Sequence, residues 1–335
     1  YYRGDTIGWV EVEAELTEPL GGGTGSNANA LGTRGIFVGG YSPSQSNDIQ
    51  FITVSTLGTS QDFGDLNSGY SAGVATNDRT RGFYSGGNTG NQLDMRLCTL
   101  ASMGDSVDGG GDLSVATKGK PTGNSSSTRG VISGGRDHPG AAEINVIQHH
   151  TIQTTGDAAD FGDLLNPRSY NGGNCQSTTR GITAGGFSPS APTRVNSIEY
   201  ITMASMGNST DFGDLVTAVS NLGAASNPIR GILAAGTDGS TALRDIDFIT
   251  IASTGNATTF GDLDNGSNFN HVKGDVGNCT SPTRCVIGGG SVPGGTGMQY
   301  VEIATTGNGV DFGGFGVNPN HSQDRGVWST GHGGL

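Results

Sequence analysis

The chain is poor in positive charge and in long apolar stretches. Its 335 residues include 17 Lys and Arg against 30 Asp and Glu, which gives a net charge of -13. No basic stripe is present to neutralise phosphates, so we expect no nucleic-acid partner. No apolar run approaches the roughly 20 residues of a membrane-spanning helix, so we expect no membrane insertion. No signal-like segment is visible, and because the chain opens at Tyr1 we expect a processed or partial product.

Cysteine and histidine are also scarce, and their spacing does not match a metal site. The four cysteines form no CxxC pair, and the six histidines form no HxH or HExxH pattern. We interpret Cys98 as a small core residue, and a Cys279–Cys285 bridge stays open. His149 and His150 occupy a strand position where other units have Tyr-Ile or Phe-Ile, so we interpret them as packing variants. We therefore expect no metal and no cofactor.

Glycine is abundant, with 61 residues and no Gly-X-Y period, and it recurs inside fixed phrases. The phrase "STDFGDL" (Ser209–Leu215) returns in closely similar form at Ser60–Leu66, Ala158–Leu164 and Thr258–Leu263. A catalytic site is normally needed once. A phrase written four times therefore indicates an architectural part.

A second phrase, "TRG" followed by a short apolar run and "GG", marks each unit. Its arginines are Arg34, Arg81, Arg129, Arg180, Arg230, Arg284 and Arg325. By subtraction they are 47, 48, 51, 50, 54 and 41 residues apart. Periods of about 40–50 residues rich in short strands are typical of propeller blades. The sequence therefore predicts an all-β, kelch-like β-propeller.

The inside of each unit is more regular than its length. Six register positions can be aligned, and they are Phe51, Leu97, His149, Tyr200, Phe248 and Tyr300. Each is followed seven residues later by glycine, and eleven later by an aspartate in all units except the fifth, which has threonine. This fixed offset predicts a hairpin between a "YITIAS"-like strand and the "DFGDL" strand. With the "RG" strand and a run before the next arginine, each blade has four strands.

The two ends of the chain suggest how the ring closes. The N-terminal "WVEVEA" (Trp9–Ala14) matches "YVEIAT" (Tyr300–Thr305) position by position, and the last unit stops after one strand. We therefore predict one domain over 1–335 with seven blades of about 50 residues. Residues 1–30 supply a closing strand and linker, 31–324 six units, and 325–335 the C-terminal closing strand. A six-bladed ring with flanking arms is the alternative.

The repeated charged residues receive a structural interpretation. We expect each repeat arginine to be held by a carboxylate, or by carbonyls, of its own or a neighbouring blade. The acids assigned to this structural set are Asp62, Asp160, Asp211 and Asp311. The phenylalanine of each phrase is expected to fill the gap between blades, and its second aspartate to satisfy turn amides. No residue is assigned a catalytic role, because paired acids in nearly every blade favour turn chemistry.

Recognition is expected in the loops between "GG" and the third strand, because loops on a rigid scaffold carry specificity. These loops contain side chains able to stack on sugars or pair with polar groups. The candidates are Tyr41, Asp137, His138, Phe187, Arg194 and Arg244. The simpler interpretation is that these loops are solvated or touch a neighbour in a particle.

Two long stretches carry a family resemblance. "NSIEYITMASMGNSTDFGDL" (Asn196–Leu215) and "RDIDFITIASTGNATTFGDL" (Arg244–Leu263) resemble repeats in virion structural proteins of marine tailed phages, notably cyanophages. The likeness covers about Leu31–Leu335, with departures such as "DGGGDL" (Asp108–Leu113). "STDFGDL" also partly resembles the Asp-box of sialidase-like propellers but lacks its following tryptophan.

The phage resemblance implies a non-enzymatic virion structural protein of the tail, fibre or particle surface. Its implied partners are other virion proteins and host-surface glycans, and homo-oligomerisation is left open. The alternative is a secreted or cell-surface carbohydrate-binding adhesin of a marine bacterium, located outside the cell instead of in a virion. A propeller glycosidase or lyase is a third and weaker hypothesis.

Overall fold

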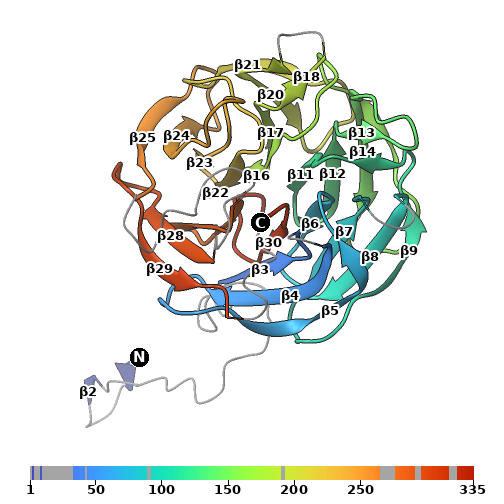
Figure 1. Cartoon of the computed structure of the whole chain (residues 1–335). Coiled ribbons are helices and arrows are strands. Elements are labelled where there is room, and N and C mark those ends of the chain that lie inside the picture. The colour runs from blue at the N-terminus through green and yellow to red at the C-terminus, as the bar shows by residue number, and fades with distance from the viewer. Residues whose placement is uncertain are drawn as a thin grey trace.

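The computed structural model shows an all-β propeller (Figure 1). It describes residues 2–3, 8–9, 33–41, 44–88, 92–189, 193–264, 276–290, 296–316 and 323–335. Within these ranges every regular element is a β-strand. The strands form six four-stranded antiparallel sheets arranged as blades around a central axis. The predicted fold class is therefore confirmed.

Each blade has an inner, a second, a third and an outer strand, counted from the axis to the rim. The inner strands are β30 (Gly326–Ser329), β6 (Val74–Asn77), β11 (Thr122–Ser125), β16 (Gly172–Gln176), β22 (Gly223–Ser226) and β26 (Gly277–Thr280). In the same order of blades, the second strands are β3 (Arg34–Val38), β7 (Arg81–Ser85), β12 (Arg129–Ser133), β17 (Arg180–Ala184), β23 (Arg230–Ala234) and β27 (Arg284–Gly288). The remaining strands complete the blades toward the rim.

The third strands are β4 (Ser46–Thr53), β8 (Asp94–Thr99), β14 (Val146–Thr151), β20 (Ser197–Thr202), β24 (Asp245–Thr250) and β28 (Gly297–Glu302). The outer strands are β5 (Gln61–Tyr70), β9 (Val107–Asp112), β15 (Ala159–Asp163), β21 (Thr210–Asp214), β25 (Thr258–Asp262) and β29 (Val310–Gly314). Short pairs join β1 (Tyr2–Arg3) to β2 (Gly8–Trp9), β10 (Thr117–Lys118) to β13 (Arg136–Asp137), and β18 (Phe187–Ser188) to β19 (Thr193–Arg194).

The blade count and the mode of closure differ from the prediction of seven blades. The C-terminal strand β30 is the inner strand of the first blade, where it pairs with β3. Ser329 of β30 bonds to both neighbouring inner strands, to Asn77 of β6 and Thr280 of β26, so the ring closes with six blades. In its local sequence Arg325 resembles the repeat arginines, which begin second strands, but in the structure it precedes the inner strand β30. This resemblance is the reason that the sequence predicted a seventh blade. The "WVEVEA" segment lies outside the described residues beyond Trp9.

Burial follows the position of a strand between the axis and the rim. Four inner strands, β6, β11, β22 and β26, are buried at every residue. They are rich in small residues. The outer strands β15, β21 and β25 each bury one phenylalanine and leave their polar positions exposed or half-buried. The hydrophobic core therefore lies between adjacent blades. Phe63 and Leu66 of the first blade, for example, pack with Tyr84 and Cys98 of the second.

The "DFGDL" phrase joins each outer strand to the next blade. The carbonyl of Phe212 accepts from the amide of Gly255 at 2.7 Å, and the amide of Asp214 is bonded by Asn256 Oδ1 at 3.0 Å. The glycine between them, Gly213, has a φ of 147°, and a Cβ there would lie 2.5 Å from the Gly255 carbonyl. The phrase needs glycine because two backbones meet at this distance. The backbone amide of the second aspartate therefore donates to a side chain of the next blade. The expected role was the reverse, in which the aspartate side chain accepts from turn amides.

Six repeat arginines form a cycle of hydrogen bonds between blades. Each begins a second strand and donates to a backbone carbonyl near the end of the next blade's third strand. The donor and acceptor residues are Arg34 to Leu100, Arg81 to Ile152 and Gln153, Arg129 to Met203, Arg180 to Ile251, Arg230 to Ile303 and Ala304, and Arg284 to Val54 and Ser55. Five of the six also lie over an aromatic ring of their own blade, at 4.2–5.8 Å from its centroid. Of the two holding groups proposed, the structure shows carbonyls for all six arginines and a carboxylate in addition for Arg284.

The four aspartates placed in the structural set do not hold these arginines. Asp62, Asp160, Asp211 and Asp311 are exposed on the outer strands, whereas the arginines start the second strands. Among the described ion pairs, one repeat arginine meets a carboxylate, and this is Arg284 with Glu302 at 2.9 Å. That acid comes from the third strand, so the carboxylate alternative does not apply to these four aspartates.

The second blade compensates for its altered phrase. The outer strand β9 has glycines at 109 and 110 where other blades have phenylalanine. Its second strand carries Phe83 at the register position of Ile36, Ile182 and Ile232, and a Cβ at Gly109 would lie 3.1 Å from that ring. A large side chain has therefore moved from the outer to the second strand, which conserves the packed volume.

The cysteines are free thiols within the blades. Cys98, Cys175, Cys279 and Cys285 are all buried and none forms a disulfide, so the Cys279–Cys285 bridge is absent. Burial raises the pKa of Cys98 and of Cys175 to about 12. These cysteines therefore behave as small apolar residues, as expected for Cys98.

Candidate binding site at the mouth of the central channel

The propeller has two different faces. Inner strands run from what we call the mouth face, at residues such as Val74, to the tail face, at residues such as Asn77. The C-terminal tail (residues 330–335) lies at the tail face, close to the axis, where Figure 1 places the C-terminus. His332 bonds to Asn77 O at 2.9 Å and the Gly333 amide donates to Ser226 O at 2.9 Å. The tail thus bridges inner strands of different blades.

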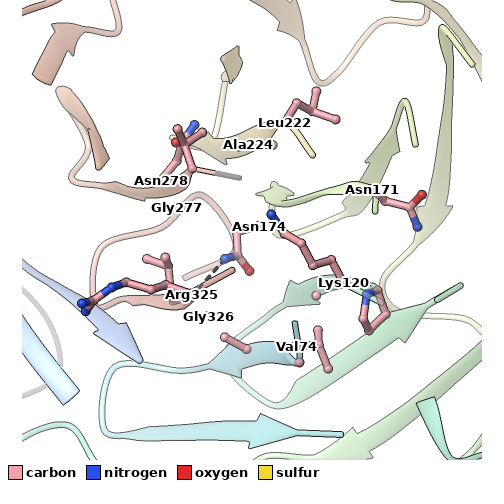
Figure 2. Close-up of a pocket in the computed structure, with 17 residues that line it drawn as sticks. Val74, Lys120, Asn171, Asn174, Leu222, Ala224, Gly277, Asn278, Arg325 and Gly326 are labelled. Carbon is pink, nitrogen blue, oxygen red and sulfur yellow. Dashed lines mark hydrogen bonds between the residues drawn. The ribbon is translucent and has the colours of Figure 1, made fainter. Parts of the chain in front are cut away.

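A cavity of about 50 Å³ opens at the mouth face, around the axis (Figure 2). The residues just before the inner strands form an upper tier, which is Gly73, Pro121, Asn171, Leu222, Val276 and Arg325. The inner strands supply a lower tier, which is Ala75, Gly123, Asn174, Ala224, Asn278 and Val327. Lys120 completes the lining. The site therefore draws a residue from every blade.

A collar of left-handed residues holds the upper tier in place. Five of the six upper-tier residues directly follow a non-glycine residue with a φ of 51–59°. These preceding residues are Ala72, Lys120, Tyr170, Asn221 and Asp324. Their backbones are linked in sequence around the mouth, from Ala72 N to Asp324 O, Lys120 N to Ala72 O, Tyr170 N to Gly119 O, and Asn221 N to Tyr170 O. Such conformations are costly and persist where the surroundings over-determine them. The rim of the cavity is therefore rigidly built.

Lys120, Asn174 and Asn278 are three of the polar side chains that line the cavity, together with Asn171 and Arg325. Lys120 reaches inward from the rim with its ammonium toward the axis, and its Nζ lies 3.5 Å from Asp324 Oδ1 (Figure 2). Asn174 crosses the axis from the fourth blade to donate to Val327 O of the first blade at 3.0 Å. Asn278 is 2% exposed, and neither its Oδ1 nor its Nδ2 has a partner among the described residues. A buried amide with no partner is costly in free energy.

The shape of β16 explains how Asn174 reaches the axis. The pairing of β16 with β17 shifts register between Gly172 and Cys175, and Asn174 has a φ of 66°. This bulge adds a residue and re-aims the side chain into the channel. The equivalent positions Ala75 and Ala224 carry side chains too short to cross it.

Arg325 lines the cavity but turns its guanidinium away from the axis, as Figure 2 shows. The group lies over the Phe315 ring at 4.4 Å from its centroid. Burial lowers the pKa of Arg325 to about 10, and the carboxylate of Asp48 partly offsets this effect. Arg325 is therefore a packing cation between blades, unlike the six arginines with which it was grouped.

The structure places part of the expected recognition set on the mouth face, beside the cavity. Asp137 lies in β13, where its Oδ1 accepts from Ala142 N at 2.6 Å, and His138 is exposed in the turn that follows. Phe187 is half-buried and lies 5.8 Å from the guanidinium of Arg136. Arg136 also donates to Tyr170 Oη at 3.1 Å. Phe187 and Tyr170 therefore lie beside a guanidinium that the sequence did not single out.

The other three candidates are distributed around the same face. Arg194 adjoins the next loop, since a Cβ at Gly239 would clash with its guanidinium. Arg244 is half-buried and donates to Leu263 O at 3.5 Å. Tyr41 is 39% exposed in the first blade. The six candidates therefore share a face but do not converge on one point.

The lining residues of the cavity were missed by sequence reasoning. Lys120, Asn174 and Asn278 lie in the runs before the second strands, where the repeat is weakest. A usable signal was present, because most inner strands have Ala, Gly or Val at the register position of Asn278. A polar residue at an axial position of a repeat protein indicates a local specialisation.

The two histidines singled out in the sequence are packing residues of the third blade. His149 contacts Phe161 in a T-shaped arrangement, and His150 Nε2 lies 2.8 Å from Thr76 Oγ1. Burial lowers the pKa of His150 to about 4, with a further lowering by the neighbouring His149.

Comparison with known proteins gives no family assignment. The sequence matches no known family model, and no curated protein is significantly similar to it. In the part of the chain that the structure describes, no helix is long and apolar enough to cross a membrane. The class that fold and site define is a six-bladed β-propeller with a polar cavity at one mouth.

Proposed function

We propose that this propeller is a non-enzymatic structural protein of a phage virion, in the tail, a fibre or the particle surface. The proposal takes its virion assignment from the repeat resemblance described above. The observation that supports a presenting role is the division of labour between the two faces. One face carries short uniform turns, and the other carries the variable loops and the cavity.

The ring itself suits rigid presentation. Six arginine–carbonyl links and the paired outer strands fix each blade to the next. Residues held on such a scaffold need little ordering on binding, which favours affinity. In this proposal the mouth face contacts host-surface glycans, while other faces dock to neighbouring virion proteins.

Peptide mass spectrometry on density-purified particles from the source tests this proposal. We expect abundant peptides of the chain in tailed particles, with a copy number that identifies head, neck or fibre. A chain found in the cell-surface fraction and missing from particles would overturn the virion role. That result would support the carbohydrate-binding adhesin, which the same mouth face would serve.

A further inference from the structure

Three of the repeat arginines share one arrangement at the tail face, where the second strands begin. Each lies over an aromatic ring of its own blade, at 4.5–5.3 Å from the centroid, and stands directly across the strand pair from a threonine. The arginine, ring and threonine are Arg34, Phe51 and Thr53 in the first blade, Arg180, Tyr200 and Thr202 in the fourth, and Arg230, Phe248 and Thr250 in the fifth.

Each of these guanidinium groups uses one side and leaves the other open. Nη1 of Arg34, Arg180 and Arg230 donates to a carbonyl of the next blade. Their Nε and Nη2 atoms, which we call the Nε–Nη2 edge, have no hydrogen-bond partner among the described residues. The carbonyl bond and the stacked ring already hold the guanidinium plane. A group that binds the edge therefore meets a pair of donors that is ordered in advance.

The sixth blade shows which group fits this edge. Arg284 has the same place and lies over Tyr300 at 4.2 Å, but Glu302 stands across the strand pair where the other three have threonine. Nε and Nη2 of Arg284 both donate to Oε1 of Glu302, at 3.0 and 2.9 Å. Its Nη1 donates to the carbonyls of Val54 and Ser55, as in the other blades. The edge therefore accepts a carboxylate, and the chain supplies one from within this blade.

The surroundings of the edges favour an acidic side chain of another protein. The Glu302 side chain is 46% exposed, so the filled edge lies at the surface, where a partner can reach its equivalents. Groups of arginines recognise acidic motifs, and arginine is enriched among residues that dominate binding at interfaces. The chain has 17 Lys and Arg against 30 Asp and Glu. Because cations are scarce, an acidic partner has few places to bind, which fixes its orientation.

We infer that the tail face is a docking surface for a protein that places aspartate or glutamate side chains at the Nε–Nη2 edges of Arg34, Arg180 and Arg230. The carboxylate of Glu302 is the internal equivalent of such a side chain. Threonine at the matching position carries no carboxylate and leaves the edge to the partner. The inference rests on the docking role in the proposed function and names the chemistry of the partner.

Nitrogen-15 NMR of the purified full chain tests the inference, because each arginine gives its own side-chain Nε–Hε signal. The probes are a hexaglutamate peptide and an uncharged hexaglutamine peptide. We expect hexaglutamate to shift the signals of Arg34, Arg180 and Arg230 but not that of Arg284, whose edge is filled. At low salt it should bind about tenfold or more tightly than hexaglutamine. A shift of Arg284 as large as the others, or equal binding of hexaglutamine, would overturn the inference.

A third probe decides between a protein and a polysaccharide as the source of the carboxylate. Hexagalacturonate carries six carboxylates, each attached directly to a sugar ring. We expect it to bind about threefold or more weakly than hexaglutamate, because the edges are half-buried and suit a carboxylate at the end of a flexible side chain. Equal or tighter binding of hexagalacturonate would overturn the protein partner and assign the tail face to an acidic polysaccharide.

Reciprocal substitutions exchange an open edge for a filled one. Thr250→Glu copies the sixth blade, so we expect the Arg230 signal to stop responding to hexaglutamate. Glu302→Thr copies the other blades, so we expect the Arg284 signal to start responding. Thr254→Glu adds the same charge at an exposed position of the same blade and is the matched control, in which Arg230 still responds. Thermal melts verify folding, and an Arg230 response that survives Thr250→Glu would contradict the inference.

These results are separable from the virion test. NMR reports on the purified chain, whereas mass spectrometry reports on where the chain resides. A chain found in particles whose arginines ignore hexaglutamate would contradict the partner chemistry alone. A chain whose arginines respond but that is missing from particles would contradict the virion role alone.

Discussion

The backbone amide of Arg34 donates to the side-chain Oγ1 of Thr330 at 2.9 Å, across 296 positions of sequence. In the other blades the same arginine amide is bonded by a residue three positions earlier, for example Asp78, Ser126 or Asn227. Thr330 thus supplies from the C-terminus the turn acceptor that the first blade lacks locally. The join between the chain ends reproduces the repeat geometry.

Removal of this acceptor should weaken the closure of the ring. Thr330→Ala leaves the Arg34 amide without its side-chain partner, and we expect a loss of about 1 kcal/mol in the free energy of unfolding. Deletion of 326–335 removes all of β30 and exposes the edge of β3, so we expect loss of the cooperative transition and aggregation. Urea denaturation followed by far-ultraviolet circular dichroism measures both. A deletion variant as stable as the full chain would contradict the observed closure.

The cycle of arginine–carbonyl bonds predicts a contrast between two substitutions. Arg230→Lys removes the planar fork, which loses one or both carbonyl bonds and its position 4.7 Å above the Phe248 ring. We expect a loss of about 1–2 kcal/mol in unfolding free energy. Asp211→Asn is the control, since this exposed aspartate does not hold the arginine, and its effect should stay within about 0.5 kcal/mol. If both variants match the wild type, the arginine cycle does not stabilise the ring.

Two repeat glycines with similar φ should respond differently to alanine. Gly213 and Gly207 have φ of 147° and 153°, but a Cβ at Gly213 would lie 2.5 Å from a neighbouring carbonyl, whereas a Cβ at Gly207 meets nothing within 4 Å. Gly207→Ala should therefore cost about 1 kcal/mol from backbone strain alone. Gly213→Ala also forces the fourth and fifth blades apart, so we expect about 3 kcal/mol or more. Thermal melts of the two variants measure the difference directly.

Acid should destabilise the propeller through its buried histidines. Burial lowers the pKa of His332 to about 4, and its Nδ1 accepts from the Gly334 amide while Nε2 bonds to Asn77 O. The pKa of His332 in the folded state lies below its unfolded value near 6.5. Between about pH 4 and pH 6.5 the unfolded state therefore binds a proton at this histidine that the folded state does not. Stability from this group is present above about pH 6.5 and is lost as the pH falls toward 4, by about 3 kcal/mol.

Other groups modify this pH dependence. His150, with a pKa lowered to about 4, acts in the same direction. Asp247 acts in the opposite direction, because burial raises its pKa to about 6 and the folded state then binds the extra proton. Unfolding free energies at pH 7 and pH 5 measure the sum. His332→Gln should reduce the pH-dependent part, and a variant with an unchanged slope would exclude His332 as a contributor.

Several parts of the structure were predictable from sequence because they repeat. The spacing of the arginines and the fixed offset from the register residue to its glycine reflect a hairpin that every blade must form. The phenylalanines of the phrase are buried between blades, and the repeat arginines are bonded as one of two stated alternatives. Periodicity exposes such features because a constraint shared by six blades appears six times.

Other parts depended on contacts between distant segments. Arg325 has the local sequence of a repeat arginine, but β30 pairs with β3 as an inner strand, and only the closed ring decides this. The four aspartates and the arginines lie in the same unit yet on different strands. Local sequence does not fix which strand occupies the axis, because the inner strands carry small residues and few periodic signals.

The sequence by itself determined the strand repeat, the propeller class and the turn chemistry, since these arise from local periodicity and glycine conformations. The tertiary structure alone decided that six blades close the ring and that Lys120, Asn174 and Asn278 surround one axial cavity. These three residues come from three blades, and their proximity follows from ring closure. The physical reason is that convergence at an axis is a property of the closed assembly, which no single repeat encodes.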